Sequence, residues 1–274
     1  MNADNKVINS HVQLPKGILK HFVDSSQRTF YLDLNSGKIG LAGARKLGTE
    51  PGYFSERQEQ YLSSEIEGPL CSLADQIRRF IDSEESELTL SLASELVFKK
   101  YITAAMARSE LAMQSFFHNS ETACLFSKQD NHDHMVFFST HHNQGISTVI
   151  KDHQLSVIVN KTDMHLVVPR NCYYTIYSEG VEMIVAPVSP VCALCLVPPG
   201  SSSKQTLLPN HTILLISKQE DISLMNTRAL LLEYTINRKF LASSTKMELE
   251  LLRDYMIKNR DFLESSYKAN HSFE

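Results

Sequence analysis

Apolar residues recur at steps of three and four between residues 53 and 81, a spacing that places side chains on one face of an α-helix. The residues that form this stripe are Leu62, Ile66, Leu70, Leu73, Ile77, Phe80 and Ile81. Acidic residues occupy the first turns, and Arg78 and Arg79 the last, which is the polarity that the helix macrodipole favours. The pattern predicts a long helix over about 55–81.

A second long helix is predicted over about 88–117, after a charged connection at 82–87. Its core candidates are Leu92, Leu96, Met106 and Leu111. Because a short loop joins the two helices, we expect an antiparallel pair.

Segments on either side of these helices follow other patterns. Pro15 stands at the first turn of a predicted short helix, and two alternating runs around a turn at 35–37 predict a β-hairpin. From residue 147 the sequence changes to short β-branched or alternating runs separated by turn residues, which is typical of strands. Helical spacing returns at 220–241, and the chain closes in an amphipathic helix with the apolar residues Met247, Leu251, Leu252, Tyr255 and Met256.

This distribution predicts an α+β fold. The antiparallel helix pair of the N-terminal half would pack on a mixed, mostly antiparallel sheet, with a C-terminal amphipathic helix. We expect one globular domain over 1–274. Its parts would be an N-terminal helix and hairpin (10–52), a helical part (53–146) and a strand-rich part with closing helices (147–274).

Composition narrows the class of protein. The chain has 274 residues, of which 42% are hydrophobic, and a net charge of −4, so net charge gives no support to nucleic-acid binding. No apolar run approaches the roughly 18 residues of a transmembrane helix, and the N-terminus lacks the pattern of a secretory signal. Five irregularly spaced cysteines favour free thiols in a reducing compartment. We therefore expect a cytoplasmic protein with no membrane contact.

Two carboxylates, Glu59 and Glu67, lie at the inner edge of the first helical stripe, where charge is unusual. Eight residues separate them, roughly 12 Å along a helix axis, which is too far for both to bind one ion directly. They are either ion-paired residues at the boundary of the core or members of a carboxylate site. If the protein has a polar functional site, we expect Glu67 to belong to it.

Histidines and cysteines give weak metal patterns. The spacing of His132, His134, His141 and His142 does not match helical metal pairs, which favours a polar surface segment. Cys192 and Cys195 lie three apart in an apolar strand, so their side chains point to opposite faces and are expected in the core. The chain also lacks a glycine-rich phosphate loop. We predict no metal site and no cofactor.

Several pieces in this order resemble a known family. They are Pro15-x-x-x-Leu19-x-x-Phe22, the hairpin, Gly52–Ser55, Glu59 and Glu67, MHLVVPRNCYY, VAPVSPVCALCLVP and SLMNTRALLLEYTINRKFLAS. Together they resemble the bacterial domain-of-unknown-function family numbered 4238, over roughly residues 10 to 245. The resemblance implies an accessory gene, sometimes suspected in phage defence; it implies no mechanism.

The chain departs from that family pattern at two places. The family has a His three residues before the proline, where this chain has Val12 and carries its histidine one position earlier, at His11. A later strand often has an aspartate before Asn-Pro, where this chain reads Val167 to Asn171, with Arg170 before Asn171. A family chemistry that relies on that histidine and aspartate would be lost or rearranged here.

His11 and Asn226 complete the catalytic candidates, and Arg228, Arg238 and Lys239 could approach a phosphate from one side. Asn226 could equally cap or interrupt a helix, and the basic residues could form a solvated face. Whether the protein is an enzyme stays open at this level.

Two functions follow. The altered family positions favour an interaction, regulatory or sensor component of an accessory system, with a protein partner or a second copy bound through the C-terminal helix. The alternative is a hydrolase directed at nucleic acid or nucleotides, acting as a toxin-like effector. The alternative requires His11, Glu67 and the helix of Asn226 to meet in one cleft.

Overall fold

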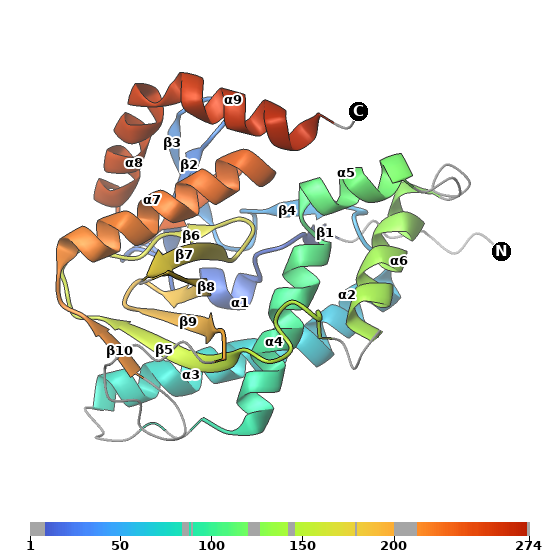
Figure 1. Ribbon diagram of the computed structural model, residues 1–274, viewed down its shortest axis with the longest axis horizontal. Helices are drawn as coiled ribbons and strands as arrows, with labels where there is room; N and C mark the ends of the chain where they lie inside the picture. The colour runs from blue at the N-terminus through green and yellow to red at the C-terminus, as the bar shows by residue number, and fades with distance from the viewer. Residues whose placement is uncertain are drawn as a thin grey trace.

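The computed structural model describes residues 9–83, 88, 90–119, 127–141, 146–178, 180–199 and 213–272 (Figure 1). The first half contains two short strands, a hairpin and most of the helices. Its elements are β1 (Asn9–His11), α1 (Lys16–Leu19), β2 (Arg28–Asp33), β3 (Ile39–Gly43), β4 (Thr49–Pro51), α2 (Glu56–Tyr61), the π-helical segment η1 (Leu62–Glu67), α3 (Gly68–Ser83), α4 (Leu92–Ala107), α5 (Glu110–Asn119) and α6 (Lys128–His141).

The second half contains most of the strands and ends in helices. Its elements are β5 (Gln154–Asn160), β6 (Val168–Pro169), β7 (Tyr174–Ser178), β8 (Val181–Ser189), β9 (Cys192–Val197), β10 (Ile213–Ile216), α7 (Gln219–Ile236), β11 (Phe240–Ser243), α8 (Met247–Lys258) and α9 (Arg260–His271). The α+β class is confirmed, with mostly antiparallel sheets and a helical C-terminus.

A five-stranded sheet with the order β10-β5-β9-β8-β7 forms the centre of the second half. Strands β10 and β5 pair in parallel and the other neighbours pair antiparallel, so the sheet is mixed. Helices α3 and α4 contact one face and α7 packs on the other (Figure 1). Alternating side chains therefore enter two cores, Cys192 on the side of α3 and α4 and Cys195 on the side of α7, as predicted from their offset of three.

A four-stranded antiparallel sheet with the order β3-β2-β11-β6 joins distant parts of the chain. The predicted hairpin is confirmed as β2 and β3, and β11 adds to it from the C-terminal part, with Leu241 opposite Leu32. Because β6 pairs with the other edge of β11, the segment that follows β6 lies close to the end of α7. This closure brings Gln13 and Asn171, 158 positions apart in the sequence, into contact.

Three predicted helices are shorter than expected. The helix over 88–117 is divided into α4 and α5 at Arg108 and Ser109, because the carbonyl of Arg108 turns to accept a hydrogen bond from the Gln13 side chain. The helix over 220–241 ends at Ile236, because 240–243 pair as strand β11. The C-terminal helix divides at Asn259 into α8 and α9.

A π-helical turn interrupts the helix that carries Glu59 and Glu67. Gly68 donates its N–H to the carbonyl of Ser63, five residues earlier. A Cβ at Gly68 would lie 2.7 Å from that oxygen, so a glycine suits this wide turn. π-Bulges inside α-helices are frequent at functional sites, and this one ends at Glu67.

The remaining expectations concern thiols, metals and membranes. Among the described cysteines, Cys71, Cys172, Cys192 and Cys195 are free; Cys124 lies outside the described residues, as does His142. The described ranges contain no cluster of three or more His, Cys, Asp or Glu side chains placed to hold a metal ion. Within those ranges, no helix combines the length and the apolar character needed to cross a membrane.

Candidate functional site

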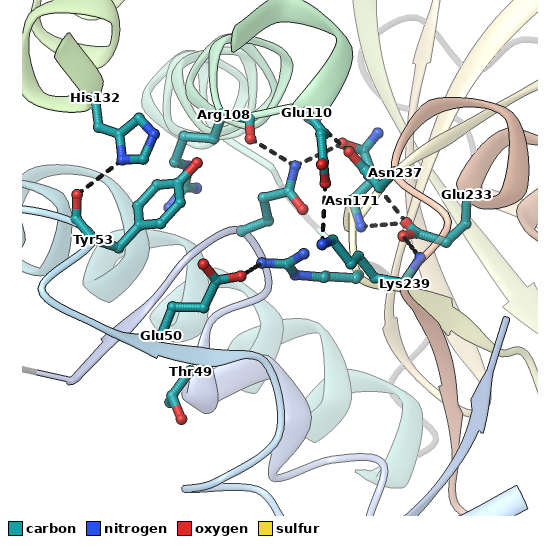
Figure 2. A network of polar contacts seen from close by, with 12 residues as sticks. Thr49, Glu50, Tyr53, Arg108, Glu110, His132, Asn171, Glu233, Asn237 and Lys239 are labelled. Carbon is teal, nitrogen blue, oxygen red and sulfur yellow. Dashed lines mark hydrogen bonds and ion pairs between the residues drawn. The ribbon is translucent and has the colours of Figure 1, made fainter. Parts of the chain in front are cut away.

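A cavity of about 270 Å³ lies where the N-terminal strands, the α4–α5 junction, α6, the end of β6 and the end of α7 meet (Figure 2). Its wall combines polar and apolar surface in about equal parts and carries charges of both signs. The lining residues are Val12, Gln13, Glu50, Tyr53, Arg108, Glu110, Met113, Gln114, His132, Arg170, Asn237 and Lys239. We call this cavity the central pocket.

The α4–α5 junction is held open by two amide side chains. The buried Gln13 donates from Nε2 to the carbonyl of Arg108 (2.8 Å) and to Oδ1 of Asn171 (3.3 Å). Asn237 accepts from the backbone N–H of Glu110 at 2.8 Å and so caps α5. The helix break therefore depends on residues distant in sequence, and it turns the side chain of Arg108 toward the pocket wall.

Arg108 is the most completely buried cation that the structure describes near the pocket. Its Nη1 donates to Oε1 of Glu67 at 2.8 Å, and its side chain is 0% exposed against 15% for Glu67. Its Nε donates to the carbonyl of Ala104 (3.2 Å). Glu67 is thus the counter-charge of a buried arginine, one of the two alternatives open from the sequence.

Two further ion pairs line the pocket. Arg170 Nη2 lies 2.5 Å from Glu50 Oε1, and Lys239 Nζ lies 3.3 Å from Glu110 Oε2. Each pair joins segments distant in sequence, and each carboxylate is partly open to solvent, 41% for Glu50 and 36% for Glu110. The Lys239–Glu110 pair is exposed on both sides and contributes roughly 0–1 kcal/mol, so a ligand can displace it at low cost. In the other pair Arg170 is buried, so a ligand that displaces Glu50 must itself supply an acceptor for the guanidinium.

A buried carboxylate, Glu233 of α7, supports the pocket from behind. It accepts hydrogen bonds from the backbone N–H of Asn171 (2.8 Å), from Nδ2 of Asn237 (3.3 Å) and from the backbone N–H of Lys239 (3.4 Å). Burial raises its pKa from 4.5 to about 7. The Glu233 carboxyl group thus holds in place the segment after β6 and the segment after α7, both of which carry pocket residues (Figure 2).

Both of those segments contain a strained residue. Cys172 has φ 60° and Arg238 has φ 51°, left-handed values that are uncommon outside glycine. Each follows directly on a residue that hydrogen-bonds to Glu233 or to Gln13. Such backbone strain is typically kept where surrounding contacts enforce it, and it is concentrated at functional sites.

The other wall is aromatic. Tyr53 and His132 stack with ring centroids 3.8 Å apart at 21°, and His132 Nδ1 lies 3.0 Å from the carbonyl of Tyr53 (Figure 2). Burial raises the pKa of Tyr53 to about 12, so its hydroxyl stays protonated at neutral pH. The predicted polar surface segment around His132 is therefore helix α6, with His132 buried against the pocket.

Several buried polar atoms around the pocket lack a hydrogen-bond partner among the described residues. They are Gln13 Oε1, Arg108 Nη2 and Arg170 Nε. All three residues line the pocket and are at most 5% exposed. Buried polar groups in native proteins are nearly always satisfied, so a concentration of such atoms beside a cavity indicates a binding site.

The structure brings three of the four catalytic candidates together. Glu59 lies beside Glu67, Ser10 and the backbone of His11, and burial followed by the neighbouring Glu67 carboxylate raises its pKa. Burial lowers the pKa of His11. Glu59, Glu67 and His11 are not among the residues that line the central pocket; Glu67 is linked to it through its ion pair with Arg108.

Asn226 does not join this group. Its Oδ1 accepts from the N–H of Val167 (2.9 Å) and its Nδ2 donates to the carbonyl of His165 (2.8 Å), so it fastens α7 to the segment before β6. The α7 segment does reach the pocket, but through Asn237 and Lys239 beyond its C-terminus. The predicted helix thus leads to the pocket, whereas Asn226 itself lies outside its lining.

The two arginines predicted to bind a ligand also lie outside the pocket lining. Arg228 is exposed. Arg238 pairs with Glu264 and lies over the rings of Tyr234 and Tyr267, which fixes α9 to α7. Lys239, the next residue, is the basic side chain of this segment that lines the pocket.

Sequence reasoning missed Gln13, Glu50, Arg108 and Glu110 because none stands in a recognisable motif. Arg170 had a signal: it lies in the segment that departs from the family pattern, and Val12, the other departure, lines the same pocket. Comparison with protein-family models, with curated proteins and with solved structures finds no match to this chain.

Proposed function

We propose that this protein is a cytoplasmic sensor or regulatory component that binds a small polar molecule in the central pocket. The observation that carries the proposal is the set of buried, unpartnered polar atoms on Gln13, Arg108 and Arg170 around a cavity of about 270 Å³. Ligand pockets commonly measure roughly 300–1,000 Å³, so this volume suits a compact ligand. A bound molecule would complete hydrogen bonds that the described protein groups leave open.

The pocket also suits a sensor because of what it joins. Its lining comes from segments of both halves of the chain, and the partly exposed pairs Arg170–Glu50 and Lys239–Glu110 cross between them. A ligand that replaces these pairs changes the free energy with which the segments hold together. We propose that this change is passed to a protein partner or a second copy bound at α8 and α9, which expose Leu251 and Phe262.

The sequence resemblance agrees with this role. We propose membership of the domain-of-unknown-function family numbered 4238 and a place in an accessory system such as phage defence. Both departures from the family pattern, at Val12 and at Arg170, fall in the pocket wall. Loss of a family chemistry there, with the cavity retained, would leave a binding site.

Ligand screening by thermal unfolding tests the proposal. Fractions of small molecules from bacterial cells are added to the protein and to Gln114→Trp, a variant of a half-buried wall residue that fills the cavity. A ligand at 100 times its Kd adds about 2.7 kcal/mol to the free energy of unfolding. We expect at least one fraction to raise the melting temperature of the wild type but not of the variant. Equal shifts in both proteins, or none, would reject the proposal.

A second function, hydrolysis of nucleotides or nucleic acid, is favoured by one observation. The pKa of Glu59 is raised by burial and by Glu67, which is how a general acid is prepared. Release of product from a nucleotide or nucleic-acid panel, lost in Glu59→Gln and kept in the exposed Glu65→Gln, would support it. Absence of product with the wild type would rule this function out.

A further inference from the structure

Each of the two buried arginines of the central pocket keeps an unused donor. Arg108 donates from Nη1 to Glu67 and from Nε to the carbonyl of Ala104, while Nη2 is buried and has no acceptor among the described residues. Arg170 donates from Nη2 to Glu50, while its Nε is buried and also has no acceptor among the described residues. Both side chains line the cavity, and both residues are at most 5% exposed.

Guanidinium groups have a defined ligand chemistry. Their N–H donors lie in one plane and match the spacing of two oxygens on a carboxylate or a phosphate. Leaving such donors buried without acceptors is costly, so two of them beside one cavity select strongly for an oxyanion.

Tyr53 strengthens this selection. Its hydroxyl lies within the electrostatic reach of Arg108, Arg170, Glu50 and Glu110. The stack on His132 fixes the direction of its ring. It therefore offers a neutral, oriented hydrogen-bond donor to the same oxyanion.

The charges of the pocket limit how much negative charge the ligand can carry. Each lining cation already has a carboxylate partner, Glu67 for Arg108, Glu50 for Arg170 and Glu110 for Lys239, so the three pairs together carry no net charge, although Glu67 is not itself a lining residue. Of these carboxylates, Glu50 and Glu110 are open enough to solvent to turn away when a ligand replaces them. The site can therefore release two cations to a ligand, which suits one or two negative charges and not a polyanion.

We infer that the central pocket holds the oxyanion group of a compact metabolite, a carboxylate or a phosphate monoester, between Arg108 and Arg170. The inference rests on the proposed function and deepens it by naming the ligand class. Glu50 acts as a built-in competitor for Arg170, which the ligand must displace. Val12 and Met113 supply apolar contacts for a short carbon body.

Calorimetric titration with four probes tests the inference: inorganic phosphate, glycerol phosphate, succinate and, as the neutral control, glycerol. We expect the phosphate compounds or succinate to bind and glycerol not to bind. If the phosphate compounds bind more tightly than succinate, the natural ligand carries a phosphate; if succinate binds more tightly, it carries a carboxylate. Arg170→Gln should weaken binding by about tenfold or more, since a charged hydrogen bond is lost. Glu50→Gln should tighten binding by about two- to fivefold, because the competitor is removed. The exposed Arg228→Gln serves as matched control and should change nothing.

The Glu50 variant keeps the test decisive if Arg170→Gln fails to fold. Failure of all charged probes to bind, or binding that is insensitive to Glu50→Gln and Arg170→Gln, would overturn the inference. The proposed function fails separately: a neutral ligand that stabilises the wild type but not Gln114→Trp would retain the sensor and reject the oxyanion. Loss of ligand stabilisation from every cell fraction would reject both.

Discussion

The buried pair between Arg108 and Glu67 yields the sharpest stability prediction. Glu67→Gln removes the counter-charge of an arginine whose side chain is 0% exposed, while the carboxylate itself is 15% exposed. Removing one partner of a buried ion pair costs roughly 3–5 kcal/mol, because the other charge stays buried without compensation. The amide oxygen can still accept the hydrogen bond from Nη1, so we expect a loss near the lower end, about 3 kcal/mol.

Thermal unfolding measures this loss. A chain of this size changes its melting temperature by roughly 2–4 °C per kcal/mol, which predicts a fall of about 6–12 °C for Glu67→Gln. The matched control is Glu65→Gln in the same π-helical segment, where the side chain is exposed and the expected effect is within about 0.5 kcal/mol. Replacing both partners, with Arg108→Met added, should recover part of the stability, because no lone charge is then buried.

The refuting result is specific. If Glu67→Gln melts together with Glu65→Gln, then Glu67 does not neutralise Arg108 and the pair is not structural. If Glu67→Gln folds with unchanged stability but no longer binds the pocket ligand, Glu67 belongs to the functional site directly.

Further predictions concern pH, packing and thiols. Because burial raises the pKa of Glu233 from 4.5 to about 7, its proton stabilises the fold fully below pH 4.5 and this stabilisation is lost as pH rises through 7. Glu233→Gln should therefore flatten the fall in melting temperature between pH 4.5 and 7.5, and parallel curves would contradict this. Gly17→Ala should lower the free energy of unfolding, measured in urea, by roughly 1–3 kcal/mol, because its Cβ would collide with Sγ of Cys71. Adding Cys71→Ala should recover most of that loss. A Gly17→Ala variant with unchanged stability would refute the close contact of α1 and α3. Thiol titration of the denatured, unreduced protein should find all five cysteines free, including Cys192 and Cys195, whereas three or fewer would show a disulfide.

The interruption at Arg108 illustrates where periodic patterns lose information. The sequence from 88 to 117 has helical spacing throughout, and local propensity favours one continuous helix. The break follows from Gln13 and Asn237, which satisfy the backbone groups that a break exposes. Contacts from residues about 95 and 127 positions away leave no trace in the local spacing.

The candidate site likewise contains residues that the sequence pattern identified and residues that it did not. Glu67 was identifiable, because a carboxylate on an apolar helix stripe has to meet a partner, and the partner is Arg108. The pattern could not place Asn226, since a buried asparagine can satisfy backbone groups as well as a ligand, and here it accepts a hydrogen bond from the N–H of Val167. Arg170 stood at a departure from the resembled family and His132 in a histidine-bearing segment, but neither pattern predicted that the two would line the same cavity.

By itself the sequence determined the elements and their class: helices in the N-terminal half, strands after residue 147, a hairpin over β2 and β3, and cysteines turned to opposite faces of β9. Those features depend on side-chain periods of 3.6 and 2, which are local. Only the tertiary structure decided that β11 joins the N-terminal hairpin, and that Arg108, Arg170 and Lys239 meet around one cavity. Such a meeting depends on chain closure between distant segments, and a single sequence does not record which distant polar groups will satisfy one another.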